Sequence, residues 1–488
     1  MLGITGFGAY LPRARLQRKA IADANAWFDS SLRDMARGER TMCNWDEDVN
    51  TMAVEAASDC LGGRDRSHVR SLFLASTSAP FLQRQNSVVV GEALDLRRDI
   101  RTMDVSGSQR AGTSAFLAAL EQAGSMLRGV SPGPNEALVV ASEHQRSKCG
   151  SVQEMLYGDA AVAMTLGTDG VLAELVAAYS TSVDFVDSYR SDGFRFDVRS
   201  EERWIRDEGY LKLVPEAATA VLQQAGVAPA SVQRFVLPAP DARTAAAVAK
   251  KIGIGEDAVA DNLLDTCGIA GAAHALLMLA HTLETAKPGD LLLVIGFGQG
   301  CDTLLLRATE RLADFRPRRG VSGALRSRRP EENYQRFSSF NGLSERDMGK
   351  RSEVDKVTYV SALYRSRRLL HGFVGGRCTE CGTVQVPKTR YCINPACTTL
   401  DSQQDHRLAD SAARVVTWTA DALTFDFDPP AYFGLIEFAE GARLMIDFTE
   451  VDPERMKSDA PLTMHFRVRQ IDDRRGFRRY FWKARLAE

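Results

Sequence analysis

Four of the nine cysteines form two closely spaced pairs, Cys378 with Cys381 and, ten residues later, Cys392 with Cys397. Two such pairs on neighbouring turns can place four thiolates around one Zn²⁺ ion in a tetrahedron. Four sulfur ligands leave no open coordination position, so the ion would be structural and would stabilise a segment too small to have its own core. The spacing therefore predicts a structural zinc site, with four reduced, buried cysteines as the alternative.

Five other polar residues could move a proton in an acid–base reaction. They are Glu143 and His144, which follow an apolar run, and Tyr189, Asp241 and Asp265, which lie outside the regular apolar periods. Carboxylate, imidazole and phenol groups are the usual acids and bases of enzymes. No motif selects among the five, and each also has a structural interpretation as a helix cap, a packing residue or a solvated side chain.

The first 312 residues alternate between short apolar runs and longer stretches with helical periodicity. Such a pattern is typical of buried strands that are covered by helices on both faces of a sheet. A similar order of elements occurs twice, which predicts two similar α/β halves at about 1–167 and 168–312. We expect strands at 2–9, 70–76, 100–105, 137–142, 160–166, 172–179, 234–237, 291–295 and 301–306, and helices at 46–60, 112–127, 211–225, 242–252 and 268–286.

The composition changes at about residue 312. Residues 313–330 are basic and rich in helix breakers, which favours an exposed linker. Residues 331–410 combine a stretch with helical pattern and the two cysteine pairs. Residues 411–488 contain five short alternating runs, and five strands of this length predict a small OB-type β-barrel.

The overall charge argues against several classes of partner. With 61 basic and 63 acidic side chains, the chain has no net field that would attract nucleic acid or an anionic membrane. No apolar run reaches the roughly 18 residues that a membrane-spanning helix needs. The five remaining cysteines are scattered, as is usual in a reducing compartment. We therefore expect a cytoplasmic protein without a membrane or nucleic-acid partner.

Several short motifs in the first 312 residues resemble the thiolase superfamily, closest to its hydroxymethylglutaryl-CoA synthase and ketoacyl synthase III branch. These motifs are Gly3–Pro12, Arg110–Thr113, Gly158–Ala160, Lys287–Asp290 and Gly296–Gly300, and their order and spacing carry the resemblance. It implies a five-layer α/β fold of two similar halves. Residues 331–488 resemble the zinc-ribbon and OB-fold proteins that accompany thiolase-like enzymes.

The resemblance also marks three positions at which this chain departs from the family. Gln109 stands at the position of the cysteine nucleophile, Pro238 at that of a histidine and Ile269 at that of an asparagine. A carboxamide cannot attack a thioester, and the adjacent Ser108 would need a general base to act instead. We therefore favour a C–C lyase that acts on a 3-hydroxyacyl-CoA by aldol or retro-aldol chemistry, without a covalent intermediate.

Three other functions remain open. They are a condensing acyltransferase similar to hydroxymethylglutaryl-CoA synthase with a non-standard nucleophile, a glutamine-type decarboxylase, and a noncatalytic scaffold that binds acyl-CoA. The resemblance implies coenzyme A as part of the substrate, with Lys250 and Lys251 as candidate contacts for its phosphates, and a homodimer formed through the thiolase-like domain. A single-strand nucleic-acid binder built on the barrel is disfavoured, because the chain is not basic.

Overall fold

The computed structural model describes residues 1–126, 135–199, 201–347, 359–472 and 474–487. The chain divides into two compact units. The first comprises Met1–Asn44, Asp48–Val88 and Leu96–Ser344, and the second comprises Trp45–Glu47, Val89–Asp95 and Glu345–Glu488. No helix in the described ranges has both the length and the apolar character needed to cross a membrane.

The first unit is built on a nine-stranded mixed sheet. The strands fall into two groups, because β1 and β8 pair at only two residues in the middle of the order. In spatial order the strands are β5 (Arg101–Val105), β4 (Val69–Ala75), β6 (Glu136–Glu143), β7 (Ala160–Gly167), β1 (Gly3–Tyr10), β8 (Ala173–Ser182), β11 (Gly300–Ala308), β10 (Leu291–Phe297) and β9 (Arg234–Val236). Strands β1, β6, β7 and β10 are buried along their whole length, as their mainly apolar sequences predict.

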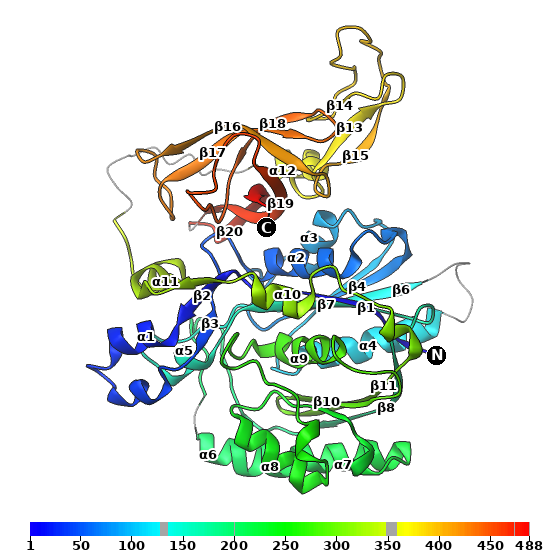
Figure 1. Cartoon of the computed structure of the whole chain (residues 1–488), viewed down its shortest axis with the longest axis vertical. Helices are drawn as coiled ribbons and strands as arrows, with labels where there is room; N and C mark the ends of the chain where they lie inside the picture. Colours follow the sequence, from blue (N-terminus) through cyan, green and yellow to red (C-terminus); the bar gives the residue numbers. More distant parts are fainter. Residues whose placement is uncertain (127–134, 200, 348–358, 473, 488) are drawn as a thin grey trace. The chain divides into compact units, whose positions relative to one another are not determined.

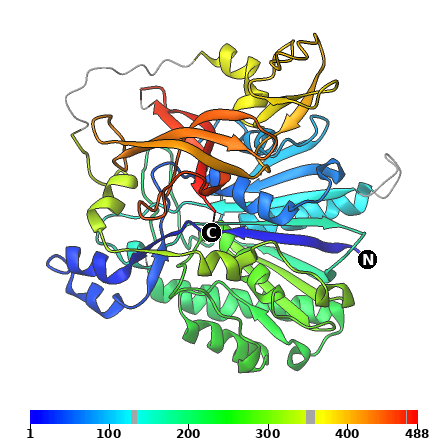
Figure 2. The ribbon, with the colours of Figure 1, turned by 45° about the horizontal axis from the view of Figure 1, so that its top comes forward.

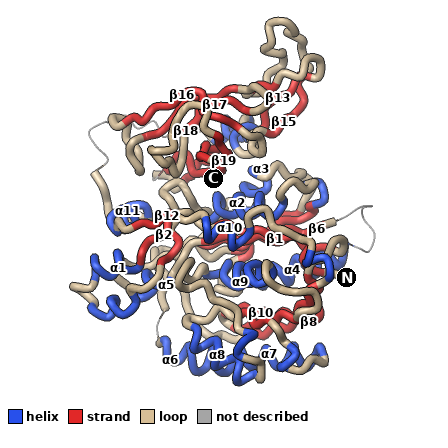
Figure 3. The backbone as a smooth tube through the Cα atoms, in the orientation of Figure 1, coloured by secondary structure: helices blue, strands red, loops and turns tan. Residues whose placement is uncertain are grey.

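Helices cover both groups of strands and also separate them (Figures 1 and 3). Helices α4 (Ala111–Met126) and α9 (His274–Leu283) lie between the groups, and each contacts strands of both. Helix α2 (Val49–Leu61) covers β1 and β7 on one outer face, and α7 (Val214–Ala225) covers β8 and β11 on the other. Helix α8 (Ala242–Ile252) packs beside α7. This arrangement confirms the predicted five-layer α/β fold of two similar halves.

Two close backbone approaches fix the central layer at the start of α4. A Cβ atom added to Gly112 would lie 2.2 Å from the carbonyl oxygen of Ala272, and one added to Gly296 would lie 1.9 Å from Thr113 Oγ1. Only glycine allows these contacts. The start of α4 is therefore held against both the turn that precedes α9 and the end of β10.

The remaining elements of the first unit are short. Residues 313–330, whose composition favours an exposed linker, contain helix α10, and the backbone N–H groups of Arg319 and Gly320 donate to the Asp59 carboxylate at 2.9 and 3.0 Å. Strand β12 then pairs in parallel with β2. The bounds are β2 (Ala14–Gln17), α1 (Arg18–Asn25), β3 (Glu39–Thr41), α3 (Asn86–Ala93), α5 (Val152–Leu156), α6 (Glu202–Trp204), α10 (Gly320–Arg326), β12 (Arg329–Glu331) and α11 (Tyr334–Phe340).

The second unit contains two sheets, whose strands are coloured from yellow to red in Figure 2. A three-stranded sheet carries the cysteine pairs, and a five-stranded antiparallel sheet follows. A bridge between Phe448 and Ala484 links the end of β18 to β20, which are the outer strands of the larger sheet. The bounds are α12 (Val360–Arg365), α13 (Arg367–Leu370), β13 (Val374–Cys378), β14 (Val384–Gln385), β15 (Gln403–Arg407), β16 (Ala413–Asp421), β17 (Ala431–Phe438), β18 (Arg443–Asp447), β19 (Pro461–Asp472) and β20 (Phe477–Leu486).

A buried ionic network lies inside the second unit. The Arg467 side chain is fully buried, and its guanidinium lies 3.2 Å from a carboxylate oxygen of Glu47 and 3.5 Å from one of Glu450. Lys483 Nζ lies 2.8 Å from Asp46, which also accepts a hydrogen bond from Thr449 Oγ1 at 2.9 Å. The short segment Trp45–Glu47 therefore belongs to the charged interior of this unit, although it is distant from Arg467 in the sequence.

Candidate functional site

The loop between β5 and α4 carries Gln109 at the point where a helix begins. Ser108 Oγ donates to the carbonyl oxygen of Gly298 at 2.8 Å and accepts from the backbone N–H of Arg110 at 3.3 Å. Both described partners of this hydroxyl are backbone groups, so neither is a base that could activate Ser108 as a nucleophile. The free N–H groups at a helix start can stabilise a developing negative charge.

The three positions that depart from the family motifs meet in one pocket of the first unit. Gln109, Pro238 and Ile269 all line this pocket. Among the described residues, no cysteine does. The oxygen atom assigned to the Gln109 carboxamide is buried and has no hydrogen-bond partner in the described part of the chain. One end of this amide is therefore available to a ligand.

Six other polar residues that were not candidates from the sequence line the same pocket: Gln145, Tyr157, Asp187, Ser188, Arg199 and Tyr210. Tyr157 forms a bridge with Ile269, and the Tyr210 hydroxyl donates to the carbonyl oxygen of Pro238 at 3.2 Å. Two phenols thus stand beside two of the three substituted positions. A usable signal was the density of Asp, Arg and Tyr residues in the non-periodic segment 184–199, which is typical of a functional loop.

Burial keeps both phenols protonated. It raises the pKa of Tyr157 well above its usual value and raises the pKa of Tyr210 to about 12. Tyr210 lies on a π-helical segment, Ile205–Leu213, which is a rare conformation that is frequent at functional sites. At neutral pH the two hydroxyls are hydrogen-bond donors without charge.

Glu143 lies at the end of β6 and is completely buried. Its carboxyl group accepts from the backbone N–H groups of Thr77 at 3.0 Å and Ala272 at 3.3 Å, and also from the Ser78 hydroxyl. Burial raises its pKa, although these donors oppose the shift. The group is saturated by internal donors and is not among the residues that line the pocket.

His144 follows Glu143 but makes a separate contact. Its Nδ1 atom lies 3.3 Å from a carboxylate oxygen of the buried Asp159. Burial opposes ionisation of Asp159, yet the His144 imidazole lowers the pKa of this carboxyl group below its usual value. The structure therefore places the two neighbouring candidates in different environments.

The other candidates lie apart from the pocket lining. Tyr189 is 52% exposed. Asp241 is the N-cap of α8 and accepts from the Thr244 backbone N–H at 2.8 Å. Asp265 lies 3.4 Å from Arg18, and its side chain is 62% exposed. Lys250 and Lys251 are exposed in the last turn of α8, and Lys251 Nζ donates to the carbonyl oxygen of Leu211.

His274 lines the pocket but has a structural role. Its Nδ1 atom accepts from the backbone N–H of Ala270 at 3.2 Å, and its Nε2 atom lies 3.0 Å from the carbonyl oxygen of Asn262. Burial lowers its pKa to about 4. The imidazole is therefore neutral at pH 7, with both nitrogen atoms engaged by the backbone.

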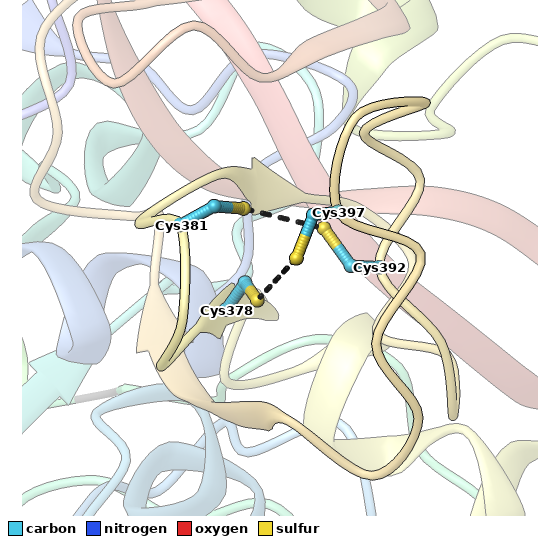
Figure 4. Close-up of side chains that lie close together, drawn as sticks. All are labelled: Cys378, Cys381, Cys392 and Cys397. Atoms are coloured by element: carbon cyan, nitrogen blue, oxygen red, sulfur yellow. Dashed lines mark hydrogen bonds between the residues drawn. The ribbon is translucent and has the colours of Figure 1, made fainter.

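The four clustered cysteines converge in the second unit (Figure 4). Their sulfur atoms all lie within 4.8 Å of one another. Cys378 Sγ is 3.9 Å from Cys397 Sγ, and Cys381 Sγ is 3.5 Å from Cys392 Sγ. Tetrahedral Zn–S bonds of about 2.3 Å require S–S separations of about 3.8 Å. The donor set and its dimensions fit a four-thiolate zinc ion.

Comparisons with known proteins agree on the first unit. Residues 222–305 match the family model "3-Oxoacyl-[acyl-carrier-protein (ACP)] synthase III C terminal". The chain is 32% identical over 321 residues to hydroxymethylglutaryl-CoA synthase from Caldivirga maquilingensis. This match covers 64% of this chain and 89% of the relative. It is also 30% identical over 307 residues to the enzyme of the same name from Pyrobaculum calidifontis. This second match covers 61% of this chain and 85% of the relative.

Solved structures show the same fold. An HMG-CoA synthase complexed with CoA superposes with a TM-score of 0.62 at 17% identity, over 73% of this chain and 94% of that chain. The 3-oxoacyl-[acyl-carrier-protein] synthase III from Aquifex aeolicus superposes with a TM-score of 0.51 at 22% identity, over 63% of this chain and 100% of that chain. These likenesses identify the fold of the first unit as thiolase-like.

The predicted C–C lyase with retro-aldol chemistry is wrong, because the relatives are synthases. The physical reason is that a carboxamide in place of a thiol at position 109 bears only on where an acyl group can be held. It does not select cleavage over condensation, since both pass through an enolate that the same donors can stabilise. With 32% identity over 89% of a relative's length, the chain belongs to the hydroxymethylglutaryl-CoA synthase family.

Proposed function

We propose that this protein is a condensing acyltransferase that forms a C–C bond between coenzyme A thioesters by Claisen-type chemistry. The observation that carries the proposal is the extended identity to hydroxymethylglutaryl-CoA synthases. The pocket of the first unit supports it, since Gln109, Pro238 and Ile269 converge there beside Tyr157, Asp187, Arg199 and Tyr210.

The acyl group stays on coenzyme A in this proposal instead of moving to the protein. No thiol is among the described residues of the pocket lining, and the Ser108 hydroxyl is hydrogen-bonded to backbone groups. Burial also raises the pKa of Cys267 to about 11 and that of Cys301 to about 12, which disfavours their thiolates. The phenol of Tyr157 can donate a hydrogen bond to a thioester oxygen as it gains negative charge.

Coenzyme A is the carrier that the family implies, and one solved relative is complexed with it. Lys250 is the stronger of the two candidate phosphate contacts, because Lys251 already donates to the backbone at Leu211. An exposed lysine attracts a phosphate as a point charge and needs no fixed geometry.

We also propose that the second unit is a zinc ribbon followed by an OB-type barrel. Cys378, Cys381, Cys392 and Cys397 would hold one zinc ion, which supplies structural stability and leaves no coordination position for substrate. In this proposal the thiolase-like domain is 1–312, the ribbon segment 331–410 and the barrel 411–488, with 313–330 between the first two, although residues up to Ser344 pack within the first compact unit. The five antiparallel strands and the bridge between their outer members support the barrel.

The first unit is proposed to form a homodimer through the open edge of its sheet. Strand β5 is the last strand in the order, and Met103 on this strand is 51% exposed. An open edge with exposed apolar side chains favours pairing with a second copy. Sedimentation of the wild-type protein and of Met103→Glu tests this, since a dimer that the substitution leaves intact would exclude β5 as its interface.

Mass spectrometry of reactions with pairs of acyl-CoAs tests the proposed activity. We expect a C–C-coupled acyl-CoA and free coenzyme A from acetyl-CoA paired with acetoacetyl-CoA or another acyl-CoA. Release of CO₂ from malonyl-CoA without coupling would instead identify a decarboxylase. Binding without turnover of any pair would identify a scaffold, and acylated Ser108 would contradict the noncovalent route.

A further inference from the structure

Asp187 has the only carboxyl group among the described residues that line the pocket. It lies in the loop that follows β8, and it shares the pocket with Gln109, Pro238 and Ile269. The backbone at Ser188 and at Gln299 favours the ionised form of its carboxylate. Gln299 adopts a left-handed backbone with φ of 52° in the glycine-rich turn between β10 and β11. Backbone groups of two separate loops therefore influence the charge of this side chain.

The groups that face Asp187 come from four elements. Arg199 lies further along the same connection, Tyr157 precedes β7, Tyr210 lies on the π-helical segment, and Cys301 is on β11. Among the described residues, no cation lies within 4.0 Å of the Asp187 carboxylate, so the nearby Arg199 charge acts on it from a greater distance. A carboxylate that is not neutralised by a direct ion pair can still accept a proton.

We propose that Asp187 is the catalytic acid–base residue of this pocket. The inference rests on the condensing function proposed above. The Asp187 carboxylate takes a proton from the α-carbon of one acyl-CoA, and the electron pair of the C–H bond moves into the enolate. The enolate carbon attacks the thioester carbonyl of the second acyl-CoA, a C–C bond forms, and the C–S bond breaks. The departing coenzyme A thiolate takes the proton from Asp187, which restores the carboxylate.

The pocket fits both halves of this step. Tyr157 is a neutral donor for the enolate oxygen, whereas Tyr210 already donates to the carbonyl oxygen of Pro238. Glu143 and His274 are saturated by internal hydrogen bonds. Burial also raises the pKa of the Asp187 carboxyl group, although Arg199 and the backbone donors oppose the shift. A carboxylate with a raised pKa is a stronger base for an α-proton.

Deuterium exchange into acyl-CoAs separates this proposal from the proposed function. Wild-type protein and Asp187→Asn are incubated with acetyl-, propionyl- and butyryl-CoA in D₂O, and the mass of each acyl-CoA is followed. We expect wild-type protein to exchange the α-protons and Asp187→Asn to slow the exchange by about 100-fold or more. Asp184→Asn is the matched control, because Asp184 is exposed in the same loop and should exchange at the wild-type rate.

Each outcome decides between the two proposals. Absence of both exchange and coupling in the wild type overturns the condensing function, whereas unchanged exchange in a folded Asp187→Asn overturns only the role of Asp187. Thermal unfolding of both variants checks the fold. If Asp187→Asn does not fold, Asp187→Glu decides: exchange with a displaced pH profile supports the role, and exchange with an unchanged profile contradicts it.

Discussion

At the scale of single residues, the charge at the pocket is set by Asp187 and Arg199. Burial raises the pKa of the Asp187 carboxyl group, and the Arg199 guanidinium pulls it down. Arg199 lines the pocket but makes no ion pair within 4.0 Å among the described residues. Arg199 therefore lowers the pKa of Asp187 through its charge at a distance and not through a direct salt bridge.

Arg199→Leu should move the acidic limb of the pH–rate profile for α-proton exchange to higher pH. The base is active only when ionised, and loss of a nearby cation disfavours the ionised carboxylate. At a pH on that limb the exchange rate should fall, while the rate on the alkaline plateau should change less. The exchange assay over a range of pH measures this. Arg203→Leu is the control, because the Arg203 side chain is 88% exposed, and an equal displacement in both variants would contradict the assignment.

At the scale of elements, the sequence predicted the helices and strands around the site better than the side chains that line the pocket. Helix α8 was predicted with its observed bounds, and the buried strands were predicted within a few residues, because apolar periodicity is a local property. Asp187, Arg199 and Tyr210 come from a long non-periodic connection that a π-helix ends. Their convergence depends on tertiary packing, which spacing along the chain does not encode.

The four zinc ligands, in contrast, could be predicted without knowledge of tertiary packing. They lie within 20 residues of one another, so their spacing alone indicates a turn-based site. Tyr157 and Ile269 are more than 100 residues apart, yet they form a bridge at the pocket. Motif resemblance located Ile269 but gave no indication of its tyrosine neighbour.

The start of α4 offers a test of how an element positions the site. Gly112→Ala places a methyl group 2.2 Å from the Ala272 carbonyl, where a backbone atom cannot swing away. Alanine would normally stabilise a helix by about 1 kcal/mol relative to glycine, but overpacking costs about 1–3 kcal/mol. We expect a net loss of stability of up to about 2 kcal/mol in denaturant unfolding. The rate of deuterium exchange into acyl-CoAs should also fall in this variant, because Gln109 lies just before this helix.

Gly255→Ala is the matched control for this substitution. An added Cβ at Gly255 meets no heavy atom within 4 Å, and its φ of −63° suits alanine. The stability and the deuterium-exchange rate of Gly255→Ala should match those of the wild type within the error of measurement. Equal behaviour of the two alanine variants would show that the contact between α4 and the Ala272 turn does not position the site.

At the scale of the whole molecule, the proposed zinc ion would stabilise the second unit. Metal analysis of the purified protein should find one zinc ion per chain, and Cys381→Ser should lose it, because three thiolates bind zinc less tightly than four. Cys149→Ser should keep the metal, since Cys149 lies outside the cluster. Wild-type protein that folds without zinc when purified in a chelator would contradict a structural role for the ion.

The buried network of the second unit gives a further test of how the chain is assembled. Asp46 lies 2.8 Å from Lys483 Nζ, and both side chains are almost fully buried. Asp46→Asn removes the negative charge and leaves a buried ammonium group without its partner, which typically costs about 3–5 kcal/mol. Because Asp46 and Lys483 belong to the same compact unit, we expect the second unit of Asp46→Asn to unfold at a lower denaturant concentration than that of the wild type.

Asp447→Asn is the control, since Asp447 and Arg469 form an exposed pair at 3.1 Å that is worth about 1 kcal/mol or less. If both variants unfold at the same denaturant concentration, the segment Trp45–Glu47 contributes no more to the second unit than a surface ion pair does.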